Sequence, residues 1–226
     1  MDICFTNVSV TYGNRVALHP LTLTLRERRI GIIGLNGSGK TTFARLINGL
    51  VKPGAGTVSV NGLDTVTDAK AVLSTVGYIF QNPQNQIIMP LVRDDIAFGL
   101  KNRGLSGTEM TAQTDGVLAR FGIAHLAGRR AHELSGGETQ LVAIASVTVT
   151  GPSVLILDEP TNQLDLRNRQ RVAETLDALR EHVIVVSHDL PLLETFERVL
   201  LFHEGRLLAD GAPDTVIAAY REVAGC

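Results

Sequence analysis

A glycine-rich segment, Gly34–Thr41, constrains this chain more than any other part of its sequence. It reads GLNGSGKT and matches the pattern G-x-x-x-x-G-K-[ST] at every fixed position. The apolar run Arg29–Ile33 precedes it like a buried strand, and Phe43 and Leu46 follow it with the spacing of a helix face. A glycine-rich turn in this place directs backbone N–H groups at phosphate oxygens, and the helix N-terminus favours their negative charge. The segment therefore predicts a phosphate-binding loop.

Two side chains at the end of this loop have specific tasks in such a site. Lys40 can reach the β- and γ-phosphates of a nucleotide, and the Thr41 hydroxyl can bind Mg²⁺. The alternative is a strand-to-helix turn that carries a lysine by chance, but the flanking strand and helix favour the phosphate site. The residues that we expect to hold the nucleotide here are Gly34, Asn36, Gly37, Ser38, Gly39, Lys40, Thr41 and Thr42.

Apolar runs and helical patterns alternate along most of the chain. Val154–Leu157 and Val183–Val186 have the composition of buried strands, and a helical pattern at Arg169–Arg180 lies between them. This alternation indicates a mainly parallel sheet that is covered by helices. Residues 3–25 instead alternate polar and apolar side chains in short runs, which is typical of half-buried antiparallel strands.

One stretch interrupts this alternation. From about residue 93 to residue 150 the pattern is helical, so we expect residues 82–150 to form a helical subdomain inserted in a nucleotide-binding core. The fold class that follows is α/β, with a mixed, mainly parallel sheet, a small antiparallel β subdomain and the inserted helices. We expect residues 1–226 to form one domain, because no linker, repeat or low-complexity tract divides them.

The composition excludes several other classes of protein. The formal net charge of −2 argues against a nucleic-acid binder that works by bulk charge. Cys4 and Cys226 have no zinc-ligand spacing and make no disulfide framework, so a reducing compartment is expected. No run approaches the roughly 18 apolar residues of a spanning helix, and the first residues lack the layout of a signal peptide. We therefore expect a soluble, cytoplasmic protein that can still dock on a membrane protein.

A second apolar strand ends in two adjacent carboxylates, Asp158 and Glu159. Side chains alternate along a strand, so the two acids take different directions. In a nucleotide hydrolase, Asp158 can hold Mg²⁺ and Glu159 can act as the general base on the attacking water. A strand that ends in Asp-Glu is by itself usually a solvated surface feature, and it is the phosphate loop earlier in the chain that favours the catalytic interpretation.

The segment LSGGE begins a long helical pattern in the inserted region. Ser135 and Glu138 make the S-x-x-E pattern of a helix capping box, which needs no functional explanation. Gly136 and Gly137 lower the helix propensity of the first turn by roughly 1 kcal/mol each, and a capping box does not require them. Bare N–H groups at a helix start would suit a closely approaching phosphate. The segment therefore predicts a second anion site, with which one subunit could complete the nucleotide site of another.

The order of these motifs resembles that of the ATP-binding-cassette (ABC) ATPases. The phosphate loop, LSGGE, the pair Asp158 and Glu159, and His188 after an apolar run follow one another as in that family, over essentially the whole chain. The LSGG signature is the most specific motif, because other P-loop NTPases lack it. The resemblance implies ATP, Mg²⁺ and ATP hydrolysis. It also implies a head-to-tail dimer, in which each ATP lies between one subunit's phosphate loop and the other's signature.

The same resemblance assigns roles to further residues. Tyr12 fits the aromatic residue that stacks on adenine, although an ordinary strand tyrosine is the alternative. Gln81 fits the glutamine near Mg²⁺ and the attacking water, and His188 fits the histidine at the γ-phosphate. The implied catalytic residues are Lys40, Gln81, Glu159 and His188, and the implied metal ligands are Thr41, Gln81 and Asp158. The residues implied to meet the nucleotide across the dimer interface are Ser135, Gly136, Gly137 and Glu138.

Two segments resemble a narrower group, the ATPases of energy-coupling-factor (ECF) importers for vitamins and transition-metal ions. They are FQNPQNQ at residues 80–86 and VRDDIAFG at residues 92–99. The resemblance makes Asp94 and Asp95 candidates for docking a transmembrane coupling subunit, although acids at a helix start also stabilise the helix dipole. The implied partners are a second ATPase subunit, this coupling subunit and an integral membrane substrate-binding subunit, with the chain at the cytoplasmic face of the membrane.

Within that group, residues 81–86 and 162–166 most resemble the ATPase of biotin importers. No residue here is expected to contact biotin, because a separate membrane subunit would hold the substrate, so cobalt, nickel or another vitamin is an alternative. The chain departs from the family at Leu141, where arginine is usual, and at Gln163, where a small residue is usual. Gln163 lies in the segment around Asp165 that matches the loop crossing the dimer interface.

Two functions outside transport compete with this interpretation. A non-transport ABC protein that acts on DNA or ribosomes usually has two fused cassettes or long arm insertions, and this chain has the length of a single cassette. A non-hydrolytic nucleotide switch should lack a carboxylate at the position of Glu159. We therefore expect an ABC-type ATPase of an ECF importer, with biotin as the first candidate substrate.

Overall fold

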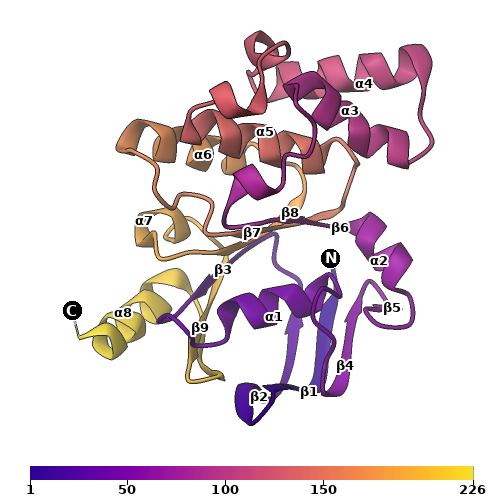
Figure 1. Ribbon diagram of the computed structural model, residues 1–226. Coiled ribbons are helices and arrows are strands. Elements are labelled where there is room, and N and C mark those ends of the chain that lie inside the picture. Colours follow the sequence, from indigo (N-terminus) through magenta and orange to yellow (C-terminus); the bar gives the residue numbers. More distant parts are fainter. Residues whose placement is uncertain (226) are drawn as a thin grey trace.

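Two β-sheets frame the molecule in the computed structural model, which describes residues 1–225 (Figure 1). The smaller sheet is antiparallel throughout. Its strands in spatial order are β2 (Arg15–Leu25), β1 (Ile3–Tyr12), β4 (Ala55–Val60) and β5 (Leu63–Asp64). Along β1 the buried side chains change from odd positions (Ile3, Phe5) to even positions (Val8, Val10), because an irregularity between Phe5 and Val8 shifts the alternation by one residue.

The larger sheet carries the parallel strands that the alternating pattern predicts. Its order is β10 (Arg206–Gly211), β9 (Arg198–His203), β3 (Arg29–Ile33), β8 (His182–Val186), β7 (Val154–Asp158) and β6 (Val76–Ile79). Neighbouring strands are parallel except β9 and β10. The carboxyl ends of parallel strands meet at one edge of a sheet. This edge therefore gathers residues 34–41 after β3, Gln81 after β6, Glu159 after β7 and His188 after β8.

Helices lie on both sides of the larger sheet (Figure 1). Helix α1 (Lys40–Ile47) lies between the two sheets and contacts β2, β4, β7 and β8. The lobe at the top of Figure 1 consists of α3 (Val92–Asn102), α4 (Gly107–Arg120), α5 (Gly136–Thr148) and the 3₁₀ turns η1 (Pro83–Asn85), η2 (Ala124–Leu126) and η3 (Ala131–Glu133). The remaining helices are α2 (Ala69–Thr75), α6 (Leu166–Asp177), α7 (Leu190–Leu193) and α8 (Pro213–Ala224).

Two clusters of buried apolar side chains hold these layers together. One surrounds α1 between the sheets, where the ring of Phe43 stacks on Phe5 with centroids 4.5 Å apart and meets Phe202 at 4.8 Å. The other joins the opposite face of the larger sheet to the helical lobe. Neighbouring residues of β3 serve both clusters, since Ile32 belongs to the first and Ile33 to the second. A central strand buried on both faces explains why β3 reads as a continuous apolar run.

The stacked rings between the sheets support a prediction about stability. Phe43 is fully buried, so Phe43→Ala is expected to lower the free energy of unfolding by about 3–5 kcal/mol, as is usual for a core phenylalanine. Leu73 on α2 is 57% exposed, and Leu73→Ala is the matched control, with an expected change within about 0.5 kcal/mol. Chemical denaturation followed by circular dichroism measures both values. Equal losses in the two variants would contradict the packing described here.

The fold class expected from the sequence is confirmed, with differences at the ends of elements. The helix expected at Arg169–Arg180 begins earlier, at Leu166, because the side chain of Asp165 accepts a hydrogen bond from the backbone N–H of Asn168 at 2.8 Å and caps it. The sequence pattern does not predict α2, since only Val72 of this helix is buried and no apolar stripe marks it.

Two further expectations concern the membrane and the cysteines. Within residues 1–225, each helix is too short or too polar to cross a lipid bilayer. Cys4 is a half-buried free thiol on β1. Cys226 lies outside the described residues, so the structure does not test the expectation about that cysteine.

Candidate active site

The loop between β3 and α1 has backbone angles that only glycine adopts without strain. The φ angles are 146° at Gly34, 77° at Gly37 and 103° at Gly39. A Cβ atom at Gly39 would lie 2.7 Å from the carbonyl oxygen of Ala17, and one at Gly34 would lie 2.1 Å from that of Phe202. Side chains at these two positions would collide with backbone, which is why the sequence pattern requires glycine there.

Lys40 lies in the first turn of α1 with its ammonium group folded back over this loop. Nζ donates hydrogen bonds to the carbonyl oxygens of Gly34 at 2.6 Å and Leu35 at 2.9 Å. The side chain is buried, and burial lowers the pKa of Lys40, while the nearby carboxylates of Glu159 and Asp158 act in the opposite direction. A buried ammonium in this place favours an anionic ligand in front of the loop.

The loop also presents a buried hydroxyl that fits a phosphate. Ser38 is 3% exposed, and its Oγ has no hydrogen-bond partner among residues 1–225. Because an unpaired buried hydroxyl is costly, a phosphate oxygen at this position would stabilise it. A cavity of about 400 Å³ opens in front of the loop, a volume in the range of small-molecule sites. Beyond the loop itself, its lining includes Tyr12, Arg15, Gln81, Asp158, Glu159 and His188.

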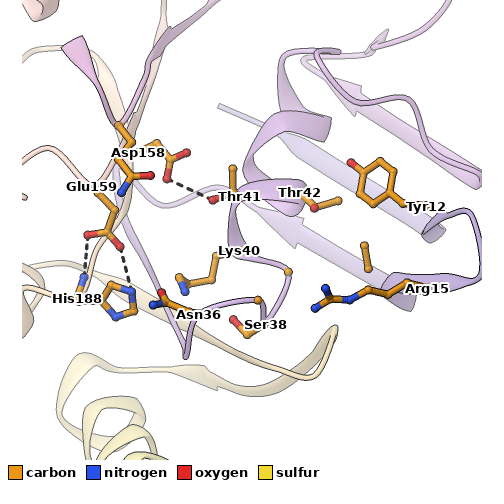
Figure 2. A pocket seen from close by; sticks show the side chains of 14 residues that line it. Tyr12, Arg15, Asn36, Ser38, Lys40, Thr41, Thr42, Asp158, Glu159 and His188 are labelled. Atoms are coloured by element: carbon orange, nitrogen blue, oxygen red, sulfur yellow. Dashed lines mark hydrogen bonds and ion pairs between the residues drawn. The ribbon is translucent and has the colours of Figure 1, made fainter. Parts of the chain in front are cut away.

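Asp158 ends β7 beside the first turn of α1 (Figure 2). Oδ1 accepts a hydrogen bond from the Thr41 hydroxyl at 3.4 Å, and Oδ2 accepts one from the Tyr78 hydroxyl at 3.0 Å. Burial raises the pKa of Asp158, and the hydrogen bond from Tyr78 opposes this shift. A hydroxyl and a carboxylate side by side are hard oxygen ligands of the kind that Mg²⁺ prefers, so the donor set fits this ion.

Tyr78 is a site residue that the sequence analysis does not find. It stands on β6, and its hydroxyl reaches Asp158 because β6 is the neighbour of β7 in the sheet. Burial and the charge of Asp158 raise the pKa of Tyr78, so the phenol stays a hydrogen-bond donor at neutral pH. No sequence pattern marks this tyrosine, since the contact depends on strand order.

Glu159 and His188 form an interacting pair at the ends of β7 and β8 (Figure 2). Glu159 Oε1 lies 3.2 Å from His188 Nε2, and Oε2 accepts a hydrogen bond from the His188 backbone N–H at 3.3 Å. Burial raises the pKa of Glu159, against the effects of that N–H group and of Lys40. Partial burial, and then the charge of Lys40, lower the pKa of His188. A carboxylate with a raised pKa beside a neutral imidazole is suited to accept a proton from water.

The backbone at Glu159 is also strained. Its φ angle is 53°, in the left-handed region that residues other than glycine occupy at a cost of order 1–3 kcal/mol. The backbone N–H of Glu159 donates to the carbonyl oxygen of Val186 at 2.8 Å, which continues the ladder between β7 and β8 past the end of the strand. This turn aims the carboxylate into the cavity instead of into the core.

Tyr12 and Arg15 face each other across the turn between β1 and β2, at the rim of the cavity. Tyr12 is 53% exposed, as a residue with an open stacking surface would be and a core tyrosine would not. The Arg15 guanidinium lies over the phosphate loop, with Nη2 3.2 Å from where a Cβ of Gly37 would be. Arg15 is a second site residue that sequence reasoning does not find, because it stands outside every motif.

The LSGGE segment lies apart from this cavity, at the start of α5 in the helical lobe. Its capping box is formed: Glu138 Oε2 accepts from the backbone N–H and the hydroxyl of Ser135, both at 2.8 Å. These two donors lower the pKa of Glu138. Gly137 is needed because a Cβ there would lie 2.3 Å from Asn168 Oδ1 on α6. Close packing against α6 therefore gives Gly137 a structural reason beside the anion site that the sequence predicts.

Comparisons with known proteins agree with these features. A protein-family model described as "ABC transporter" matches residues 18–162, which include the phosphate loop, LSGGE and the two carboxylates at the end of β7. The chain belongs to the ABC transporter family. It is an ABC-type ATPase. The family model ends short of two proposed site residues, since its match covers neither Tyr12 nor His188.

Individual relatives and structures place this ABC ATPase more closely. It is 63% identical to a biotin transport ATP-binding protein, BioM, of Rhizobium etli, over 99% of this chain and 100% of that protein. It is 41% identical to an energy-coupling factor transporter ATP-binding protein, EcfA1, of Halalkalibacterium halodurans, over 83% of this chain and 69% of that one. An ATP-binding cassette solved as a dimer in a post-hydrolysis state with ADP and Pi superposes with a TM-score of 0.82, at 26% identity over 93% and 98% of the two chains.

In this ABC ATPase the structure separates the two acids at the start of α3. Asp94 is exposed. Asp95 is 6% exposed, and its carboxylate accepts from the backbone N–H groups of Ile88 at 2.8 Å and Met89 at 3.1 Å and from the Ser146 hydroxyl at 2.8 Å. Asp95 therefore links α3 to α5 and also to the loop that precedes α3. This corrects the expectation that both carboxylates face a partner.

The two departures of this ABC ATPase from its family have different surroundings. Leu141 is 1% exposed and belongs to the apolar cluster that joins the lobe to the sheet. An apolar residue therefore suits this position, and no surface charge is lost there. Gln163 is exposed, has a φ angle of 60° and borders a hollow between the loop after β7 and the start of α5.

Proposed function

We propose that this chain is the ATPase subunit of an energy-coupling-factor importer that takes up biotin. The supporting observation is its 63% identity, over 99% of the chain, to a protein named for biotin transport. The chain needs no biotin site of its own, because in such an importer an integral membrane subunit holds the substrate. Importers of cobalt, nickel or another vitamin are the nearest alternatives.

In the proposed pose, ATP lies in the cavity in front of the phosphate loop, with its adenine at the rim. The adenine stacks on the exposed ring of Tyr12. The β- and γ-phosphates meet Lys40 and the Ser38 hydroxyl, and Arg15 stands close enough to the loop to meet a phosphate or the ribose. The loop residues that supply backbone N–H groups or side chains in this pose are Gly34, Asn36, Gly37, Gly39, Thr41 and Thr42.

In this proposal the metal site lies at the adjacent Thr41 hydroxyl and Asp158 carboxylate. Thr41 and Asp158 would hold Mg²⁺, with Gln81 on the same cavity wall as a further ligand. When bound, Mg²⁺ neutralises charge on the phosphate oxygens. The Tyr78 hydroxyl keeps the Asp158 carboxylate oriented toward α1.

In the proposed hydrolysis, Glu159 takes a proton from a water molecule that attacks the γ-phosphate. Its raised pKa makes it a better proton acceptor than an ordinary carboxylate. Gln81 holds that water, and His188 donates a hydrogen bond from Nε2 to the γ-phosphate. Lys40 offsets the charge that gathers on the γ-phosphate oxygens during transfer.

A second copy or a close paralogue would complete the site. Ser135, Gly136, Gly137 and Glu138 lie away from the cavity of their own chain, so a phosphate held there belongs to another subunit. Ser135 stands at the N-terminus of α5, where the helix dipole favours an anion. The similar cassette solved as a dimer with ADP and Pi supports this arrangement.

We also place the dimer at the cytoplasmic face of the membrane, beneath a transmembrane coupling subunit. Exposed Asp94 in the helical lobe offers that subunit a negative charge, whereas Asp95 has an internal role. Closure on ATP would bring the two helical lobes together, and hydrolysis would release them. The coupling subunit would convert this motion into substrate release to the cell.

A pull-down with a trapped variant tests the transport proposal. Glu159→Gln is expected to hold the ATP-bound dimer, so tagged protein purified from detergent-solubilised membranes with MgATP should bring a polytopic coupling subunit and a small integral membrane protein. The small protein names the substrate, and biotin binding to it supports the proposal. Lys40→Ala, which should bind ATP far more weakly, is the control. Recovery of ribosomal or DNA-bound partners without integral proteins would contradict transport.

A substitution at the rim of the cavity tests the pose of the nucleotide. Tyr12→Ala is expected to raise KM for ATP by roughly three- to tenfold, since one aromatic stacking contact is worth about 0.5–1.5 kcal/mol. Tyr12→Phe keeps the ring and should leave KM nearly unchanged. Steady-state ATPase kinetics measure both variants. An unchanged KM in Tyr12→Ala would remove Tyr12 from the proposed site.

A further inference from the structure

The C-terminal helix α8 brings a phenol to the edge of the active site. Tyr220 stands on α8, which packs beside β9 (Figure 1), and its hydroxyl lies 3.4 Å from His188 Nδ1. The two residues are 32 positions apart in the chain. Tyr220 and Glu159 both line a cavity of about 540 Å³ that adjoins the nucleotide cavity.

The place of the Tyr220 hydroxyl is set by packing. The tyrosine is half-buried, and its ring packs against the large apolar cluster together with Ala219 and Val223 of the same helix. A ring held in this way can direct its hydroxyl with little loss of side-chain entropy on binding a partner. The hydroxyl is therefore positioned before any nucleotide arrives.

Each ring nitrogen of His188 has a polar partner, and these partners indicate which nitrogen carries the proton. Nε2 lies 3.2 Å from Glu159 Oε1, and an ionised carboxylate can only accept a hydrogen bond. A neutral imidazole has one donor nitrogen and one acceptor nitrogen. Nε2 is then the donor and Nδ1 the acceptor, and a phenol hydroxyl is a group that can donate to Nδ1.

The tautomer of His188 matters because the imidazole is proposed to meet the γ-phosphate of ATP. A γ-phosphate presents acceptor oxygens only, so it is stabilised by an Nε2–H group and repelled by an Nε2 lone pair. Burial and the charge of Lys40 lower the pKa of His188, which makes the neutral ring the form whose tautomer has to be set. In the proposed hydrolysis Glu159 serves the attacking water, so Tyr220 is the partner left to hold the His188 ring.

We propose that Tyr220 is a positioning residue that holds His188 in the Nε2–H tautomer and aims this group at the γ-phosphate. The proposal rests on the role proposed above for His188 in ATP hydrolysis. In this proposal Tyr220 acts through His188 and needs no contact of its own with ATP or with the attacking water. With this role of Tyr220, helix α8 contributes a residue to the hydrolytic site in addition to packing against β9.

Removing the hydroxyl while keeping the ring tests this role. Tyr220→Phe is expected to lower kcat by roughly three- to tenfold with KM for ATP changed less than about twofold, the size expected for one neutral hydrogen bond. Val223→Ala is the matched control, because Val223 packs on the same cluster but carries no hydroxyl. An unchanged kcat in Tyr220→Phe, or an equal loss in Val223→Ala, would overturn the proposal.

Imidazole ¹⁵N spectra of the full chain provide a readout that loose packing would not change. The His188 signals are assigned by their absence in His188→Ala. In the unaltered protein we expect a protonated Nε2 and an unprotonated, hydrogen-bonded Nδ1. In Tyr220→Phe, Nδ1 should shift toward an unbonded nitrogen or a mixture of tautomers, and in Val223→Ala it should not.

The ¹⁵N spectra of Tyr220→Phe and the turnover of His188→Ala distinguish a failure of this proposal from a failure of the proposed function. An unchanged Nδ1 signal in Tyr220→Phe would overturn the hydrogen bond from Tyr220, whatever the kinetics. Full turnover in His188→Ala would instead contradict the role of His188 in hydrolysis, and with it the catalytic effect assigned to Tyr220.

Discussion

Glu159→Gln is expected to lower kcat for ATP hydrolysis by about 10²–10⁴-fold, the range contributed by a positioned general base. Glutamine keeps the size of the side chain and a carbonyl oxygen that can accept from the His188 N–H, but its amide cannot take a proton from water. ATP should still bind, because the phosphate loop is untouched. Phosphate release under saturating MgATP measures the loss, and size-exclusion chromatography with ATP should show an accumulated dimer.

The control for this variant removes a carboxylate elsewhere. Glu194 is exposed at the end of α7, and Glu194→Gln should keep full turnover. Full turnover in Glu159→Gln as well would falsify the general-base role. A large loss of ATP binding in Glu159→Gln would show that the carboxylate acts on the bound nucleotide instead of on the attacking water.

Lys40→Ala is expected to weaken ATP binding by about 10²-fold or more, since charge-assisted hydrogen bonds to phosphate are worth about 1.5–3 kcal/mol each and Lys40 can make two. Hydrolysis should be lost together with binding, because the same ammonium group offsets charge on the γ-phosphate. Lys40 is buried, and its ammonium group already lies against the loop that would hold the phosphates. Isothermal titration with ATP measures the effect.

Lys52→Ala is the matched control for this second variant, because Lys52 is exposed and lies outside the loop. It should bind ATP like the unaltered chain. Lys40 also holds the carbonyl oxygens of Gly34 and Leu35, so the thermal unfolding of Lys40→Ala has to be recorded beside the titration. Normal ATP affinity in a folded Lys40→Ala protein would contradict the proposed pose.

Local chemistry explains why much of the candidate site could be predicted from the sequence. The loop at 34–41 needs glycines for its own backbone angles, which are positive in φ at Gly34, Gly37 and Gly39. The capping box of Ser135 and Glu138 likewise spans one helical turn. The ends of buried strands, where Asp158 and Glu159 stand, are visible as apolar runs that stop at acids. Such features depend on neighbours along the chain.

The sequence by itself therefore determined the α/β fold class, the phosphate loop, the carboxylates at the end of β7 and the ATPase family. Only the tertiary structure decided which side chains support them: Tyr78 on Asp158, Tyr220 on His188, and Ser146 on Asp95. These pairs lie 80, 32 and 51 residues apart. Each contact exists because two elements are neighbours in space. Hydrophobic periodicity shows which face of an element is buried, but it carries no information about the element packed against that face.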